Sequence, residues 1–116
     1  MRFGVPVDEE RMVALLRPDD ALRTVVTADA YGAGAADALV GRALAGVPRD
    51  GYALVGAVGH DFYEGARAGA RGYPRFTDPA LRGPEGYAAY LRMAVERSLE
   101  RCGADRFDVL LLHNPD

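Results

Sequence analysis

The sequence contains no lysine, isoleucine, tryptophan or glutamine, and all fourteen of its basic residues are arginine. This bias is typical of a genome rich in codons for arginine, alanine and glycine. It nevertheless has a chemical consequence, because any reaction step that needs a lysine amine cannot be performed by the residues of this chain.

Cysteine is nearly absent as well, since Cys102 is the only one and an internal disulfide is therefore excluded. Its place at the end of an apolar helical pattern favours a packing role. No apolar run approaches the ~18–20 residues that span a bilayer, and acids stand near the N-terminus where a secretion signal is apolar. Together with a net charge of −3, these absences predict a cytoplasmic protein that binds neither a membrane nor a nucleic acid.

What the sequence does contain is an alternation of strand and helix patterns over 116 residues, enough for one domain spanning 1–116. Amphipathic spacing, with glycine and proline at the ends, predicts three helices, and apolar runs predict four strands. The last two apolar runs lack polar residues on either face, so we expect buried strands there. The helices are expected over 8–17, from 35 to 46 and from 84 to 103, and the strands over 2–7, 24–27, 52–59 and within 106–116.

Strand and helix alternate regularly, which predicts an α/β fold with parallel β/α units. Two architectures fit: a doubly wound sheet, or the N-terminal half of a (β/α)8 barrel with about four strands and three helices. Both bind ligands at the carboxyl ends of the strands. We therefore expect a site among residues 27–31, 58–61 and 113–116, next to a long glycine-rich loop over 60–83.

Two other kinds of site, a dinucleotide site and a metal site, are also compatible with residues near these strand ends. The stretch GAGAAD (32–37) follows a strand and opens a helix, as a dinucleotide fingerprint does, but it ends in the anionic Asp37. A second interpretation is a metal site formed by His60, Asp61, Glu64 and His113. A glycine-rich helix start and ordinary loop polarity explain these patterns more simply, and we expect no metal. The sequence has no P-loop, zinc-type spacing or nucleophile elbow.

Two segments point to a particular family. The final stretch, SLERCGADRFDVLLLHNPD (98–116), resembles the aldo-keto reductase pattern S-L-x-R-L-x-x-D-x-x-D-L-x-L-x-H-x-P-D. Upstream, TADAYGAGAADALVGRAL (27–44) is similar to that family's D-T-A-x-x-Y-G-x-G-x-S-E-x-x-L-G-x-A-L. The run YALVGAVG (52–59) takes the place of a strand that normally ends in T-K-V-G. The resemblance extends in order from about residue 4 to 116.

The resemblance implies the N-terminal half of a TIM barrel that reduces aldehydes or ketones with NADPH. In that chemistry a tyrosine protonates the carbonyl oxygen, a histidine hydrogen-bonds to the same oxygen, and a lysine–aspartate pair lowers the pKa of the tyrosine. A phenol of pKa ~10 needs such a cation to act readily as an acid. Tyr31 matches the tyrosine and His113 the histidine, but Val26 occupies the aspartate position and Ala57 the lysine position.

Possible replacements for the missing pair are few. Asp29 lies three residues from Val26, so in an extended segment it faces the other way. Arg42 and the loop arginines are the only cationic substitutes, and arginine does not relay protons. The resemblance therefore implies an oxidoreductase with impaired catalysis, or alternatively a non-catalytic, re-purposed barrel that binds a ligand or regulates.

The length of the chain leads to one more expectation. A barrel of this type needs roughly 250 residues, so we expect a fragment, or a half-barrel that self-associates. The resemblance places most NADPH contacts beyond Asp116, and the cofactor-binding residues stay unknown. The expected partner is a small carbonyl compound, whose identity the loop over 60–83 does not indicate.

Overall fold

Three strands pair in parallel, in the order β1-β2-β3, and form the sheet of the protein. The structure is a computed structural model that describes residues 8–69 and 72–113. The strand expected over 2–7 lies outside the described residues, as do the last three residues of the predicted fourth strand. The strands are β1 (Thr24–Val26), β2 (Ala53–Val58) and β3 (Val109–Leu112).

All three predicted helices are present, and their ends follow capping chemistry. The carboxylate of Asp8 accepts a hydrogen bond from the Arg11 backbone N–H at 3.3 Å and begins the first helix. Pro84 begins a short 3-10 turn that leads into the last helix, which ends before Gly103. The helices are α1 (Glu9–Leu16), α2 (Ala35–Leu44) and α3 (Tyr87–Cys102), and the 3-10 turns are η1 (Tyr31–Gly34), η2 (Arg49–Gly51) and η4 (Pro84–Gly86).

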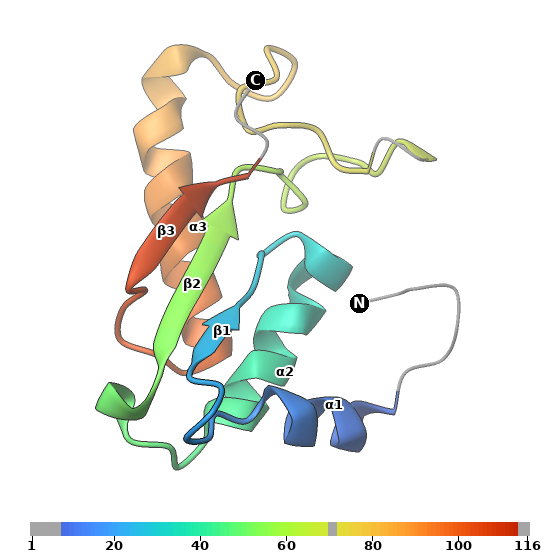
Figure 1. Cartoon of the computed structure of the whole chain (residues 1–116). Coiled ribbons are helices and arrows are strands. Elements are labelled where there is room, and N and C mark those ends of the chain that lie inside the picture. Colours follow the sequence, from blue (N-terminus) through green and yellow to red (C-terminus); the bar gives the residue numbers. More distant parts are fainter. Residues whose placement is uncertain (1–7, 70–71, 114–116) are drawn as a thin grey trace.

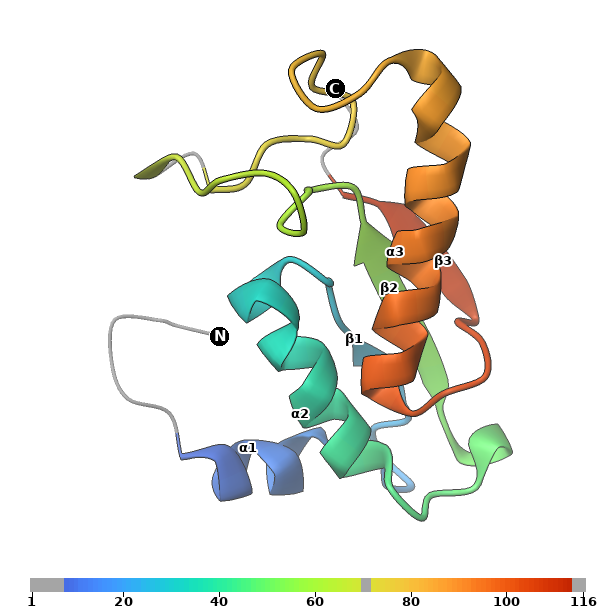
Figure 2. The ribbon, with the colours of Figure 1, turned by 180° about the vertical axis from the view of Figure 1, so that it is seen from behind.

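The helices α2 and α3 cover one face of the sheet, and the opposite face is left without a helix among the described residues (Figures 1 and 2). The apolar residues of α2 at helical spacing are buried, as amphipathic spacing predicts: Ala36, Leu39, Val40, Ala43 and Leu44. In contrast, α1 packs against α2 and contributes no buried residue, and its Leu15 is exposed. Of the apolar residues at helical spacing in α1, Met12, Val13 and Leu16 are partly buried and Leu15 is exposed, and Leu16 packs against the core.

Two apolar clusters fill the space between the sheet and these helices. The larger joins Val25 and Leu54 of the sheet to Val40 and Leu44 of α2, with Cys102 of α3 beside them. Each such fully buried side chain contributes roughly 1.5–3 kcal/mol by leaving water. Cys102 is buried, as predicted, and burial raises the pKa of its thiol to about 12.

The second cluster packs the long loop over 60–83 against α3. Phe76 stacks on Tyr90 with ring centroids 5.3 Å apart, and both rings are buried with Val58 and Ala94. The Arg82 guanidinium lies 4.5 Å from the centre of the Tyr90 ring. The loop therefore has a core of its own and packs against the carboxyl end of the sheet.

The expectation that the last two strands are buried on both faces is wrong. In β2 only alternate residues are buried, and in β3 all four are exposed by 45–49%. The reason is that α2 and α3 cover one face only, and that β3 pairs with β2 alone among the described strands. The predicted α/β class with parallel β/α units is confirmed. None of the helices in the described ranges is long and apolar enough to cross a bilayer.

Candidate active site

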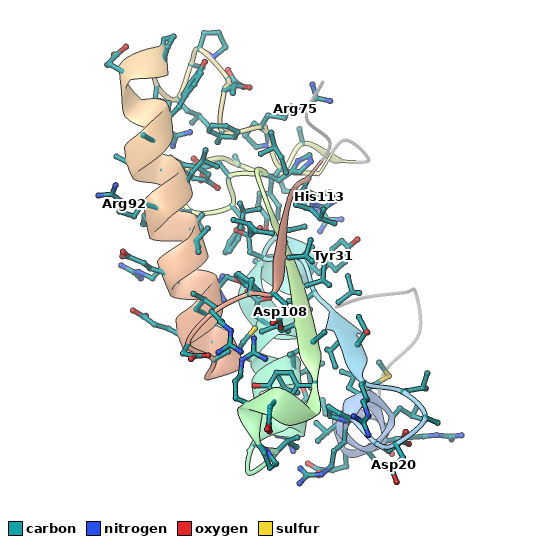
Figure 3. The ribbon with its side chains drawn as sticks, turned by 60° about the vertical axis from the view of Figure 1, so that its left-hand side comes forward. Asp20, Tyr31, Arg75, Arg92, Asp108 and His113 are labelled. Atoms are coloured by element: carbon teal, nitrogen blue, oxygen red, sulfur yellow. The ribbon has the colours of Figure 1, made fainter. Side chains whose placement is uncertain are left out.

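The two residues that the sequence singles out, Tyr31 and His113, lie together at the carboxyl end of the sheet (Figure 3). Tyr31 opens η1 just after β1, and His113 directly follows β3. Their ring centroids are 5.7 Å apart, and the rings are perpendicular. The Tyr31 side chain is 50% exposed, so a ligand can reach it from solvent.

A tight turn places Tyr31 at this edge. The ladder of β1 continues past its last residue, because the Asp29 backbone N–H donates to the Ala57 carbonyl at 3.0 Å. The Tyr31 backbone N–H then donates back to the Ala28 carbonyl at 3.1 Å and closes the turn. Ala33 follows with a φ of +52°, a conformation that costs an alanine about 1 kcal/mol. These backbone hydrogen bonds direct the chain from the end of β1 into η1, where Tyr31 lies.

A third ring, that of His60, belongs to the same group. Its centroid lies 4.8 Å from that of His113, with the two planes at 68°. Val58 pairs with Leu112, so the residues that follow the two strands emerge side by side. The sequence analysis placed His60 within the expected site at 58–61 and considered it as a metal ligand, but it did not predict its contact with His113. The signal was present in the placement of both histidines just after neighbouring parallel strands.

The environment of His113 favours the neutral imidazole. Its Nδ1 is buried and has no hydrogen-bond partner among the described residues. Burial lowers the pKa of His113, and the nearby His60 lowers it further. A neutral imidazole donates a hydrogen bond without bringing a charge to the site.

The four residues considered for a metal site do not come together to form one. No group of three or more histidine, cysteine, aspartate or glutamate side chains within the described ranges is placed to hold a metal ion. Asp61 instead accepts a charge-assisted hydrogen bond from Arg82, whose guanidinium also lies 3.3 Å from a Glu64 carboxylate oxygen. Two of the four residues considered as metal ligands, Asp61 and Glu64, therefore pair with Arg82 in the loop.

The positions of the missing pair are apolar and lie on the face without helices. Val26 is 63% exposed there, and its partner in the sheet register is Val55, two residues before Ala57. Asp29 is fully buried on the opposite, helix-covered side, as the alternation predicts. Asp29 therefore does not replace a carboxylate at position 26.

Asp29 is unusual in its own right. Neither carboxyl oxygen has a hydrogen-bond partner of normal geometry among the described residues. Burial raises the pKa of Asp29 to about 7, and the nearby Asp37 adds to this effect. Arg101 and the backbone amide of Ala30 oppose the shift without cancelling it. A carboxyl group in these surroundings holds its proton up to about neutral pH.

The carboxylate of the neighbouring Asp37 has three side-chain hydrogen-bond donors. It accepts hydrogen bonds from the Thr27 hydroxyl at 2.7 Å and the Ser98 hydroxyl at 2.8 Å. It also pairs with the Arg101 guanidinium at 3.0 Å. These bonds tie the end of β1, α2 and α3 together. Asp37 is thus a buried structural anion, and the glycine-rich start of α2 does not present it to a ligand.

The expected cationic substitutes also have other partners. Arg42 pairs with Glu9 and Glu10 of α1, with the Glu9 oxygen at 3.2 Å. Among the loop arginines, Arg82 pairs with Asp61 and Glu64; Arg101 of α3, which was not an expected substitute, pairs with Asp37. Arg42 is therefore wrong as a stand-in for the missing lysine.

We compared the sequence and the structure with those of known proteins, and both comparisons found matches. A family model described as "Aldo/keto reductase family" matches residues 7–116. The chain belongs to the aldo-keto reductase family. It is also similar to the solved structure of the aldo-keto reductase AKR11C1 from Bacillus halodurans in its holo form, with 28% identity and a TM-score of 0.65. The match covers 93% of this chain and 32% of that one, so the chain spans about a third of the length of this aldo-keto reductase.

Proposed function

We propose that the protein is an NADP-dependent oxidoreductase of aldo-keto reductase type that reduces the carbonyl group of a small aldehyde or ketone. The observation that carries this proposal is the perpendicular contact of Tyr31 and His113 at the carboxyl end of the sheet. The family membership supports it. A hydroxyl and an imidazole from two different strand ends form a pair that can hydrogen-bond to one oxygen atom.

In this proposal Tyr31 and His113 divide the work on the carbonyl oxygen. The Tyr31 hydroxyl donates a hydrogen bond and then its proton to that oxygen, and His113 donates a second hydrogen bond from an uncharged ring. Both interactions strengthen as negative charge develops on the oxygen. The hydride is the contribution of the nicotinamide cofactor when it is bound.

The described residues fit the carbonyl-facing part of such a site. Two arginines beside the loop, Arg82 and Arg101, are engaged by Asp61 and Asp37, so the proposal assigns neither of them to the cofactor's phosphates. NADPH is therefore proposed on family membership, and its binding residues are left unassigned. We also propose a cytoplasmic location and a fragment of a longer barrel, the latter supported by the 32% coverage of the solved relative.

We propose in addition that turnover is slowed, because hydrocarbon side chains stand at Val26 and Ala57. Adding Val26→Asp and Ala57→Lys together restores a carboxylate and an ammonium on the helix-free face. If the chain retains a reductase site, carbonyl-dependent NADPH oxidation rises on the order of a hundred-fold, as expected for recovered acid–base catalysis. The matched control is Val26→Asp with Val55→Lys, which places the same charges on the same face but two residues further from the site.

The alternative function is a re-purposed barrel that binds a ligand without reducing it, and the apolar residues at the two positions favour it. NADPH titration of the folded protein, followed by a screen of small aldehydes, decides between the two. Binding and a gain in the double variant support the reductase. Absence of NADPH binding by the folded full-length protein, with circular dichroism showing that it is folded, overturns it. Size-exclusion chromatography tests the proposed self-association, which the exposed leucines of β3 support.

A further inference from the structure

The contact between His60 and His113 is built by the backbone around Gly59. The His113 backbone N–H donates to the Val58 carbonyl at 2.8 Å, so β2 and β3 remain paired up to the site. Gly59 then adopts a φ of +139°, which side-chain-bearing residues rarely adopt. A Cβ at this position would lie 3.2 Å from the His113 carbonyl oxygen. A glycine here allows the two histidine rings to approach within 4.8 Å.

His60 is also held from its other sides. Its backbone bridges to Arg75, and its carbonyl oxygen accepts a hydrogen bond from the Tyr90 hydroxyl at 3.2 Å. Its Nδ1 lies 3.0 Å from the Tyr73 carbonyl oxygen. Because a carbonyl oxygen can only accept, Nδ1 carries the hydrogen in this bond, which fixes the tautomer of the neutral ring. The loop thus presents the His60 ring to His113 in one orientation.

We propose that His60 is a positioning residue for the proposed carbonyl reduction, and that it acts by fixing the ring of His113 beside Tyr31. This inference rests on the proposed function of Tyr31 and His113. It assigns a role to the loop after β2, in the region where this chain has Ala57 instead of a lysine. His60 acts on the histidine of the pair, whereas the missing lysine would act on the tyrosine.

The same contact contributes to the lowered pKa of His113, after the larger effect of burial. The titratable rings that face His113 are His60, from the loop after β2, and Tyr31, from η1. Arg75 reaches this group through its backbone bridge to His60. A charge on His60 disfavours a second charge on His113, which adds to the effect of burial on the pKa of His113. Loss of His60 therefore raises the pKa of His113.

The test is a titration of the histidine ring signals by NMR from about pH 5 to about pH 9, the range in which imidazoles ionise. The chain has two histidines, so His60→Phe leaves His113 as its remaining signal, and a His113→Asn spectrum confirms the assignment. We expect a higher midpoint for His113 in His60→Phe and in a second variant, His60→Gln. Tyr73→Phe is the matched control, because it keeps the carbonyl oxygen that binds His60 and leaves the midpoint unchanged.

The kinetic arm uses the pH profile of carbonyl reduction. In His60→Phe the acidic limb of the kcat profile moves to higher pH together with the NMR midpoint, which a merely structural role does not produce. An unchanged His113 midpoint in both His60 variants overturns the inference. A shifted midpoint in a protein that reduces no carbonyl compound leaves the histidine coupling standing and refutes the proposed function instead.

Discussion

Replacement of Asp29 by asparagine should stabilise the protein at alkaline pH and lose this advantage at acidic pH. The pKa of Asp29 rises from 3.8 to about 7, chiefly because the carboxyl is buried. With a raised folded-state pKa, the contribution of Asp29 to stability is greatest below pH 3.8. It falls as the pH rises to about 7 and is constant above that value.

The magnitude follows from the same two values. One pH unit corresponds to about 1.4 kcal/mol, so the ionised Asp29 costs about 4 kcal/mol relative to its protonated form. The asparagine amide is also buried and carries a cost of its own, about 1–3 kcal/mol. That cost is independent of pH and cancels when the two proteins are compared at pH 4 and pH 8. The difference in unfolding free energy between Asp29→Asn and the parent should therefore grow by about 4 kcal/mol over this range.

Urea unfolding followed by circular dichroism, at a series of pH values, measures this difference. Asp37→Asn is the matched control, because Asp37 is equally buried but accepts hydrogen bonds from Thr27, Ser98 and Arg101. It should destabilise the protein throughout the neutral and alkaline range. A difference between Asp29→Asn and the parent that does not change with pH would refute the reasoning, since it would mean that Asp29 ionises alike in both states.

Three further predictions concern packing and reactivity. Ser98→Ala should lower the free energy of unfolding by about 2 kcal/mol in urea melts, because it removes one hydrogen bond to the buried Asp37 carboxylate. Gly41→Ala should cost about 2 kcal/mol or more in the same assay, because a Cβ there would lie 2.4 Å from the Arg101 carbonyl oxygen and force α2 and α3 apart. Cys102 should resist iodoacetamide at pH 8 until denaturant is added, since its thiol has a pKa of about 12 and is buried; mass spectrometry showing rapid labelling of the native protein would contradict this.

The helices were predictable because their signals are local. The apolar spacing of α2 predicts its buried face, which includes Leu39 and Val40, and Gly103 predicts the end of α3. The burial of β3 was not predictable in the same way. Its valine and leucine side chains show which residues avoid water, but burial also depends on the elements that pack against them.

In the candidate site, too, some residues were predictable from the sequence, whereas contacts that depend on the tertiary structure were not. The family resemblance and the positions of both residues at strand ends implied that Tyr31 and His113 share a site, and the structure brings their rings into contact. The contact of His60 with His113 depends on the register of β2 and β3 and on the backbone of Gly59, which no local pattern encodes. Asp29 lacks a hydrogen-bond partner among the described residues because of how its neighbours are placed in space, which the sequence does not reveal.

The two faces of β1 explain why the chain cannot supply the missing carboxylate by a small rearrangement. Val25, Thr27 and Asp29 are buried on the helix-covered face, whereas Val26 lies on the open one. A slip of one residue would carry Asp29 towards the open face, but it would also remove the Thr27 hydroxyl from Asp37 and expose Val25. The register is therefore fixed by the core and by the Asp37 network, and a carboxylate reaches the site only through substitution at position 26. In the proposed carbonyl reduction, Tyr31, His113 and His60 would therefore have to act without this carboxylate.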